Sequence, residues 1–140
     1  SNPETFDLIT LWHVLEHIPD LYAFIGKLKS LLNPDGVLII AVPNFKSSDA
    51  KHYGPSWAAY DVPRHLWHFS RTSIERIFSD FGMKVLEELP LIFDSFYVSL
   101  LSEKYKTGHG NYIKAFYQGM RSNLDAKQSG EYSSLIYLIK

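Results

Sequence analysis

The chain has 140 residues, a formal net charge of −1 at pH 7 and no cysteine. This charge gives no general attraction to nucleic acid or to an anionic membrane, and the lack of cysteine excludes a disulfide framework and thiol chemistry. A hydrophobic content of 46%, without an apolar run near the ~20 residues of a membrane helix, predicts one cytoplasmic globular domain.

The first two residues, Ser1-Asn2, are typical of the remnant of a cleaved expression tag. The chain that follows begins with a strand, a helix and a second strand. The apolar runs Phe6–Leu11 and Val37–Val42 predict parallel strands buried on both faces. Between them, apolar residues spaced by three and four predict a helix over Leu21–Leu32, which Asp20 caps. The stretch Asn33–Gly36 predicts the turn before the second strand, so the whole unit is a right-handed crossover.

Residues 45–69 have no helical or strand period but are rich in aromatic residues and histidine. We expect a structureless loop that covers a substrate, because ordered loops longer than ~12–15 residues are commonly functional. The remaining periodic segments predict five elements: a helix over Ser70–Phe81, a strand over Met83–Leu89, helices over Ile92–Leu101 and Asn111–Asn123, and a strand over Ser133–Ile139.

Polar residues follow the first strand, at the edge of an α/β sheet where ligands bind. His13, Glu16 and His17 are spaced i, i+3, i+4, so they share a face if residues 12–18 are helical. Two imidazoles and a carboxylate, with His65 or His68 from the loop, make a candidate set for a divalent metal. The alternative is that Glu16 and His17 only fix the turn after the strand through backbone hydrogen bonds. His13 would then face the substrate without a metal, as a candidate catalytic residue.

The loop carries a second candidate set. His65 and His68 are candidate general bases, since an imidazole titrates near neutral pH, and Arg64 is a candidate for binding an anionic group of a substrate. The alternative for each histidine is structural, with one capping the following helix while Trp67 and Phe69 anchor the loop.

The sequence His13-x-x-Glu16-His17 also matches a signature of zinc hydrolases, in which both histidines lie on one continuous helix. Here Pro19 limits any helix to two turns. This function is therefore the weaker alternative.

Three stretches, residues 6–20, 31–44 and 61–85, together resemble the second half of a class I S-adenosylmethionine-dependent methyltransferase, from its fourth strand to its seventh. They are most similar to the branch that holds the ubiquinone-biosynthesis O-methyltransferases and related type 11, 12 and 23 domains. The resemblance implies an α/β, Rossmann-like sheet in which the last strand is antiparallel and lies between the second and third. It also implies that residues 1–140 form one partial domain, with a helical insertion over residues 92–130.

The resemblance further implies a function. The full-length protein that contains this chain would transfer a methyl group from S-adenosylmethionine to oxygen of a small molecule, with no nucleic-acid or membrane partner. The family binds the methionine part of the cofactor at positions that correspond to Leu11, Trp12 and His13. Its glycine-rich cofactor loop would precede Phe6, so we expect the chain alone to be inactive and not to bind the cofactor.

Two further expectations concern metal and partners. Related small-RNA methyltransferases hold magnesium with a Glu-x-x-Glu-His motif and a loop histidine. Here His13 stands in place of the first glutamate, which favours manganese, iron or zinc, or no metal.

The strand Phe6–Leu11 would be an unpaired edge of the sheet, so we expect the chain to self-associate through it. A catalytically inert interaction module of the same fold is the alternative function.

Overall fold

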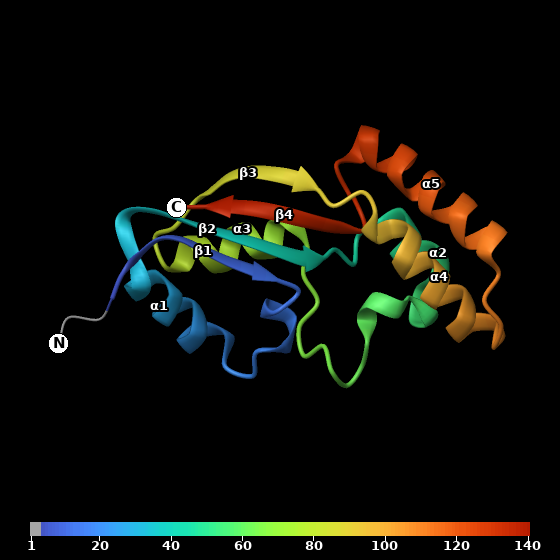
Figure 1. Cartoon of the computed structure of the whole chain (residues 1–140), viewed down its shortest axis with the longest axis horizontal. Coiled ribbons are helices and arrows are strands. Elements are labelled where there is room, and N and C mark those ends of the chain that lie inside the picture. Colours follow the sequence, from blue (N-terminus) through green and yellow to red (C-terminus); the bar gives the residue numbers. More distant parts are fainter. Residues whose placement is uncertain (1–3) are drawn as a thin grey trace.

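The computed structural model describes residues 4–140 and contains a four-stranded sheet (Figure 1). Its order is β1-β2-β4-β3, in which β1 is Phe6–Trp12, β2 is Leu32–Pro43, β3 is Val85–Pro90 and β4 is Ser134–Ile139. β1 pairs with β2 in parallel, and β4 runs antiparallel between β2 and β3. The predicted strand order and the antiparallel last strand are confirmed. The tag remnant predicted at Ser1-Asn2 lies outside the described residues.

The predicted crossover is present, with one correction. Helix α1, Leu21–Leu31, begins where the Asp20 side chain accepts a hydrogen bond from the Ala23 N–H. The predicted turn over Asn33–Gly36 instead lies within the first residues of β2. β1 and β2 stay paired on both sides of this segment, with a shift of register between Phe6 and Leu8. The two backbones approach closely there, since an added Cβ on Gly36 would lie 2.9 Å from the Phe6 carbonyl oxygen. This segment is therefore an irregularity inside the strand.

Helices α1 and α3, Arg71–Asp80, pack on one face of the sheet. Their apolar side chains join those of the strands in one core: Leu21, Ile25, Leu28, Ile74 and Phe78 with Leu38, Ile40, Leu135 and Tyr137. The two helices also touch directly, since the Tyr22 hydroxyl donates to the Asp80 carboxylate at 3.0 Å.

The other face of the sheet is largely open in the described part of the chain. Leu8, Trp12 and Leu86 are exposed by 54%, 52% and 59%. The prediction that β1 is buried on both faces is therefore wrong for this chain. Its run of apolar residues has the composition of a doubly covered strand, but helices pack on only one of its sides.

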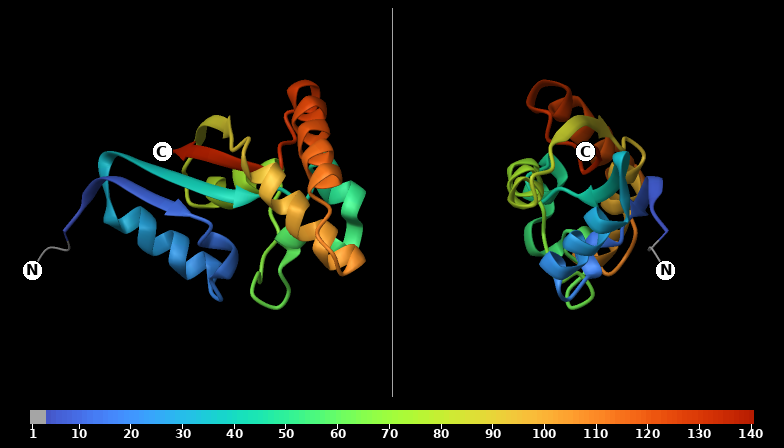
Figure 2. Two further views of the ribbon diagram at one scale, coloured as in Figure 1. Left: turned by 45° about the vertical axis from the view of Figure 1, so that its right-hand side comes forward. Right: turned by 90° about the vertical axis from the view of Figure 1, so that its left-hand side faces the viewer.

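The remaining helices gather at the end of the sheet where β1 and β2 finish (Figures 1 and 2). The predicted structureless loop over residues 45–69 contains helix α2, Ser48–Tyr53, and two short 3-10 helices, Gly54–Ser56 and Ala58–Tyr60. The reason is a second apolar cluster, in which Tyr53 and Trp57 pack against Val98. Burial of these large side chains orders a segment whose sequence has no helical period.

Helices α4, Asp94–Thr107, and α5, Tyr112–Ser129, are each longer than predicted and lie within the expected insertion over residues 92–130. They pack closely at Gly119, where an added Cβ would lie 2.8 Å from the Phe96 ring. No helix among residues 4–140 combines the length and apolar character needed to cross a bilayer.

Self-association through β1 remains a prediction. β1 is an edge strand of the described sheet, and Phe6 and Leu8 are 45% and 54% exposed. Unpaired backbone groups beside exposed apolar side chains favour pairing with another chain. Light scattering at tens of micromolar should give a mass above that of one 16.1 kDa chain, and replacing Leu8 by lysine should reduce it. A monomer at that concentration would contradict the prediction.

Candidate functional site

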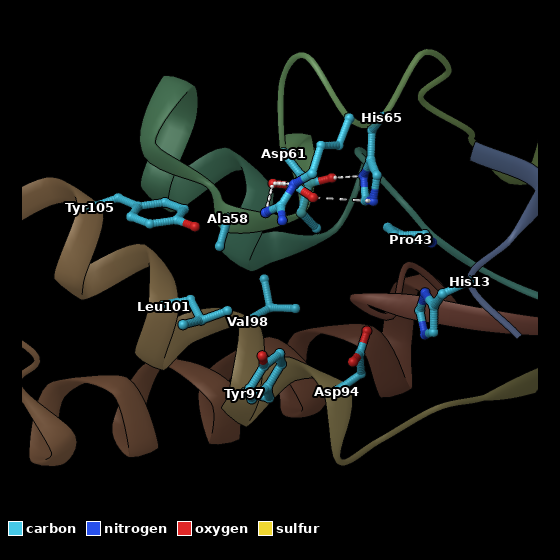
Figure 3. A pocket seen from close by; sticks show the side chains of 12 residues that line it. His13, Pro43, Ala58, Asp61, His65, Asp94, Tyr97, Val98, Leu101 and Tyr105 are labelled. Atoms are coloured by element: carbon cyan, nitrogen blue, oxygen red, sulfur yellow. Dashed lines mark hydrogen bonds and ion pairs between the residues drawn. The ribbon is translucent and has the colours of Figure 1, made fainter. Parts of the chain in front are cut away.

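A cavity of about 230 Å³ lies at the carboxyl end of β1 and β2 (Figure 3). Its polar lining comes from three separate segments: His13 after β1, Asp61, Arg64 and His65 from the loop before α3, and Asp94, Tyr97 and Tyr105 from α4. Its apolar wall includes Val98 and Leu101 of α4. The position is the one where open α/β sheets bind ligands.

His13 occupies a special backbone conformation at the end of β1. Its φ is +53°, and its backbone N–H still donates to the Ala41 carbonyl oxygen at 3.0 Å. The side-chain Nδ1 lies 3.3 Å from Oε1 of Glu16. This hydrogen bond raises the pKa of His13 against the opposing effect of burial, and the charges of Asp94 and Glu16 raise it further.

The loop is attached to the segment after β1 by backbone hydrogen bonds. The N–H groups of Leu66 and Trp67 both donate to the Glu16 carbonyl oxygen, at 2.8 and 3.3 Å. The Trp67 indole donates to the Ile18 carbonyl oxygen at 2.7 Å. These contacts bring His65 beside His17, with ring centroids 4.7 Å apart.

The loop side chains also hold one another. Arg64 donates from Nε and from a terminal nitrogen to Oδ1 of Asp61, at 3.1 and 2.5 Å. His65 is largely buried, its Nδ1 lies 2.7 Å from the Ala59 carbonyl oxygen, and its Nε2 lies 3.8 Å from Asp61. His65 therefore lines the cavity in a fixed orientation.

Glu16, His17 and His65 form a cluster whose potential ligand atoms all lie within 4.8 Å of one another. Glu16 is only 1% exposed, and its Oε2 has no hydrogen-bond partner. A buried carboxylate oxygen without a partner is costly, and a cation would remove that cost. Three of the four predicted metal ligands thus come together, whereas His13 contacts only Oε1 of the same carboxylate.

Residues 12–18 do not form the helix that would place His13, Glu16 and His17 on one face. Only Leu15–His17 is helical, as a single 3-10 turn, and the positive φ of His13 places that residue outside it. A positive φ lies outside the right-handed α-helical region, so no helix begins at His13. His13 and His17 therefore share no continuous helix, which removes the structural basis of the zinc-hydrolase alternative.

Three other predicted site residues, His68, Leu11 and Trp12, do not line the cavity. His68 is largely exposed and lies outside the cavity, with its ring 5.0 Å from the Tyr60 ring. Partial burial of the imidazole and the nearby His65 lower the pKa of His68. The side chain of Leu11 packs against the sheet core, whereas Trp12 is half exposed. Of the proposed cofactor residues, Trp12 is the most exposed, whereas Leu11 and His13 are both partly buried.

The sequence did not reveal Asp61, Asp94, Tyr97 and Tyr105 as cavity residues. Asp94 begins α4 and accepts a hydrogen bond from the Ser134 hydroxyl, and its carboxylate points toward the His13 side chain (Figure 3). Its distance from His13 in the sequence left no local pattern that connects the two. The Asp at a helix start was the one available signal.

A family model described as a methyltransferase domain matches residues 1–88. The chain belongs to this family. The ubiquinone biosynthesis O-methyltransferase of Rhodopseudomonas palustris (strain HaA2) is 31% identical over 97 residues, which cover 65% of this chain and 38% of that enzyme. The same-named enzyme of Haemophilus ducreyi is 46% identical over 43 residues, which cover 31% of this chain and 18% of that enzyme.

Solved methyltransferase-like structures share the fold. The [4+2]-cyclase SpnF matches with a TM-score of 0.58 at 14% identity, over 99% of this chain and 50% of that one. The mycolic acid cyclopropane synthase CmaA1, solved with SAH and CTAB, matches with a TM-score of 0.55 at 14% identity, over 97% of this chain and 55% of that one. The chain thus spans about half of these structures, and the predicted resemblance to part of a class I methyltransferase is confirmed.

Proposed function

We propose that the chain forms part of an S-adenosylmethionine-dependent methyltransferase that methylates oxygen of a small molecule. The single observation that carries this proposal is the cavity at the carboxyl end of β1 and β2, where His13 and His65 face one small space. The family supports the transfer chemistry, and the imidazoles support an acceptor that must lose a proton.

In the proposed mechanism, S-adenosylmethionine supplies an electrophilic methyl group when bound. His13 accepts the hydroxyl proton of the acceptor as the oxygen attacks, and the carboxylate of Glu16 at 3.3 Å stabilises the imidazolium that forms. The apolar wall of Val98 and Leu101 excludes water from the attacking oxygen. Arg64 forms an ion pair with Asp61. It would therefore bind an anionic substrate group by giving up its contact with Asp61.

The residues at the end of β1 fit one wall of a cofactor site. Trp12 is half exposed there, but the backbone N–H of His13 is already used by Ala41. We propose that the open sheet face and the β1 edge are covered by the remainder of a methyltransferase domain, which would supply the other walls. The chain alone should then bind no cofactor.

A divalent cation is a second proposal, favoured by the partnerless Oε2 of Glu16. Glu16, His17 and His65 would supply one oxygen and two nitrogen ligands, a set that suits manganese, iron or zinc better than magnesium. A cation there would lie beside the cavity and would attract an acceptor hydroxyl or its anion.

Calorimetric titration of S-adenosylmethionine tests the main proposal. We expect the 140-residue chain to give no heat of binding, whereas a longer protein that contains this chain and a preceding glycine-rich loop should bind it. If that longer protein does not bind S-adenosylmethionine, the enzyme proposal fails and the interaction module becomes the better account.

The same instrument tests the cation. Manganese titrated into the chain should bind at one site and lose affinity by more than tenfold when Glu16 is replaced by glutamine, since one ligand charge is removed. His109→Ala is the matched control, because His109 is exposed on the turn between α4 and α5. Equal binding by wild type and Glu16→Gln would contradict the site.

A further inference from the structure

A second cavity, of about 510 Å³, lies among the end of α2 and the helices α4 and α5. We call it the basic groove and define it by His52, Glu103, Lys106, Lys114, Tyr117 and Arg121. It shares no lining residue with the cavity that holds His13. The basic groove therefore needs an account of its own.

The groove carries an excess of positive charge. Three cationic side chains, of Lys106, Lys114 and Arg121, line it against the single carboxylate of Glu103. Within residues 4–140, neither lysine makes an ion pair within 4.0 Å, and Arg121 approaches Asp125 only at 3.9 Å, on the surface. Glu103 is 5% exposed and accepts a hydrogen bond from the Tyr53 hydroxyl, so it points into the protein.

The positive charge of the groove affects the pKa of His52. Burial lowers the pKa of His52, and the cations Lys106 and Arg121 lower it further against the opposing charge of Glu103. Lys106 also lies with its Nζ 5.9 Å from the centre of the Tyr53 ring. Lys106 of α4 and Arg121 of α5 therefore both lie near the His52 imidazole, although they come from different helices.

Helix α5 continues the groove into an apolar surface. Its buried residues are all small or polar: Ala115, Gln118, Gly119, Ser122 and Ala126. A series of large apolar residues is instead exposed: Tyr112, Ile113, Phe116, Tyr117, Met120 and Leu124. At 100° per residue these six positions fall on one arc of the helix, and Lys114 and Arg121, seven residues apart, lie beside that arc on the groove side. Ile113 and Tyr117 belong to both the arc and the groove lining.

We propose that the basic groove binds the anionic head of an amphiphile, a phosphate or carboxylate group, while its apolar chain lies along the exposed arc of α5. Charge complementarity assigns the head group, because Lys106, Lys114 and Arg121 outnumber the one acidic side chain. The apolar arc assigns the chain of the amphiphile, since large apolar side chains exposed side by side commonly mark a binding site. This ligand site is independent of the proposed methyl transfer.

Octyl phosphate is the probe, titrated calorimetrically into the 140-residue chain at low salt. It should bind at one saturable site at least tenfold more tightly than inorganic phosphate, because the octyl chain buries apolar surface. Octyl glucoside, which has the chain without the charge, should bind no more tightly than inorganic phosphate. Affinity for octyl phosphate should fall as salt is raised.

Variants assign the site. The double substitution Lys106→Gln and Lys114→Gln should weaken octyl phosphate binding about tenfold, from the loss of two exposed charge interactions. The matched control is Lys104→Gln with Lys127→Gln, which removes the same charge from the same two helices outside the groove. All four lysines are exposed, so the variants should keep the far-UV circular dichroism of wild type.

Two sources share this chemistry, a free amphiphile and a lipid in a bilayer. Co-sedimentation with phosphatidylglycerol vesicles, lost in the groove variant and not seen with phosphatidylcholine, would assign the bilayer lipid. Binding of octyl phosphate without co-sedimentation would assign the free amphiphile. The proposal is overturned if octyl phosphate does not bind, or if the control variant weakens it as much as the groove variant does.

Discussion

Replacing His13 by alanine should lower the rate of methyl transfer by about 10²- to 10⁴-fold, the usual contribution of a positioned general base. The measurement is kcat in the longer methyltransferase that contains this chain, at saturating cofactor. His13 projects into the cavity from the end of β1 with its Nδ1 on Glu16, which leaves Nε2 for the acceptor proton. His109→Ala should keep the wild-type rate, because His109 does not line the cavity.

The pH dependence separates a base from a packing residue. A histidine must be neutral to accept a proton, and Glu16 raises the pKa of His13 above its ordinary value of 6.5. The rate should therefore fall as pH drops through an inflection above 6.5. Replacing Glu16 by glutamine removes the charge that stabilises imidazolium and should move the inflection to lower pH. If the dependence of the rate on pH is the same in wild type, His13→Ala and Glu16→Gln, His13 is not the base.

Replacing Asp49 by alanine should lower the free energy of unfolding by about 3 kcal/mol or more, because buried donors to a carboxylate lose their partner. Asp49 is fully buried and accepts from three side chains: the Trp57 indole at 2.9 Å and the hydroxyls of Ser122 and Ser133 at 2.7 Å each. These donors come from the loop, from α5 and from the residue before β4, so one carboxylate joins three segments.

Urea denaturation followed by circular dichroism measures this effect. The matched control is Asp125→Ala, because Asp125 is exposed and accepts from the Ser48 hydroxyl at 2.6 Å. Its loss should cost less than about 1 kcal/mol, since exposed polar pairs contribute little. If both variants have the same midpoint, Asp49 does not hold these segments together.

The strands and the two helices that cover the sheet could be predicted from the sequence. Their patterns are local: the run Val37–Val42, the apolar stripe of α1 and the Ser70 cap of α3 all appear within a few residues. The strand order came from the resemblance, and the sheet confirms it. Helix α2 could not be predicted, because its buried side chains pack against α4, which is distant in the sequence.

The candidate site divides in the same way. The sequence alone shows which chemical groups follow β1 and occupy the loop, among them His13, Glu16 and His65. That Glu16 and His65 meet, and that Asp94 lines the same cavity as His13, became visible only in the folded chain. Both depend on contacts between segments that are distant in the sequence, namely the backbone hydrogen bonds from the loop to the Glu16 carbonyl oxygen and the packing of α4, and no local periodicity predicts such contacts.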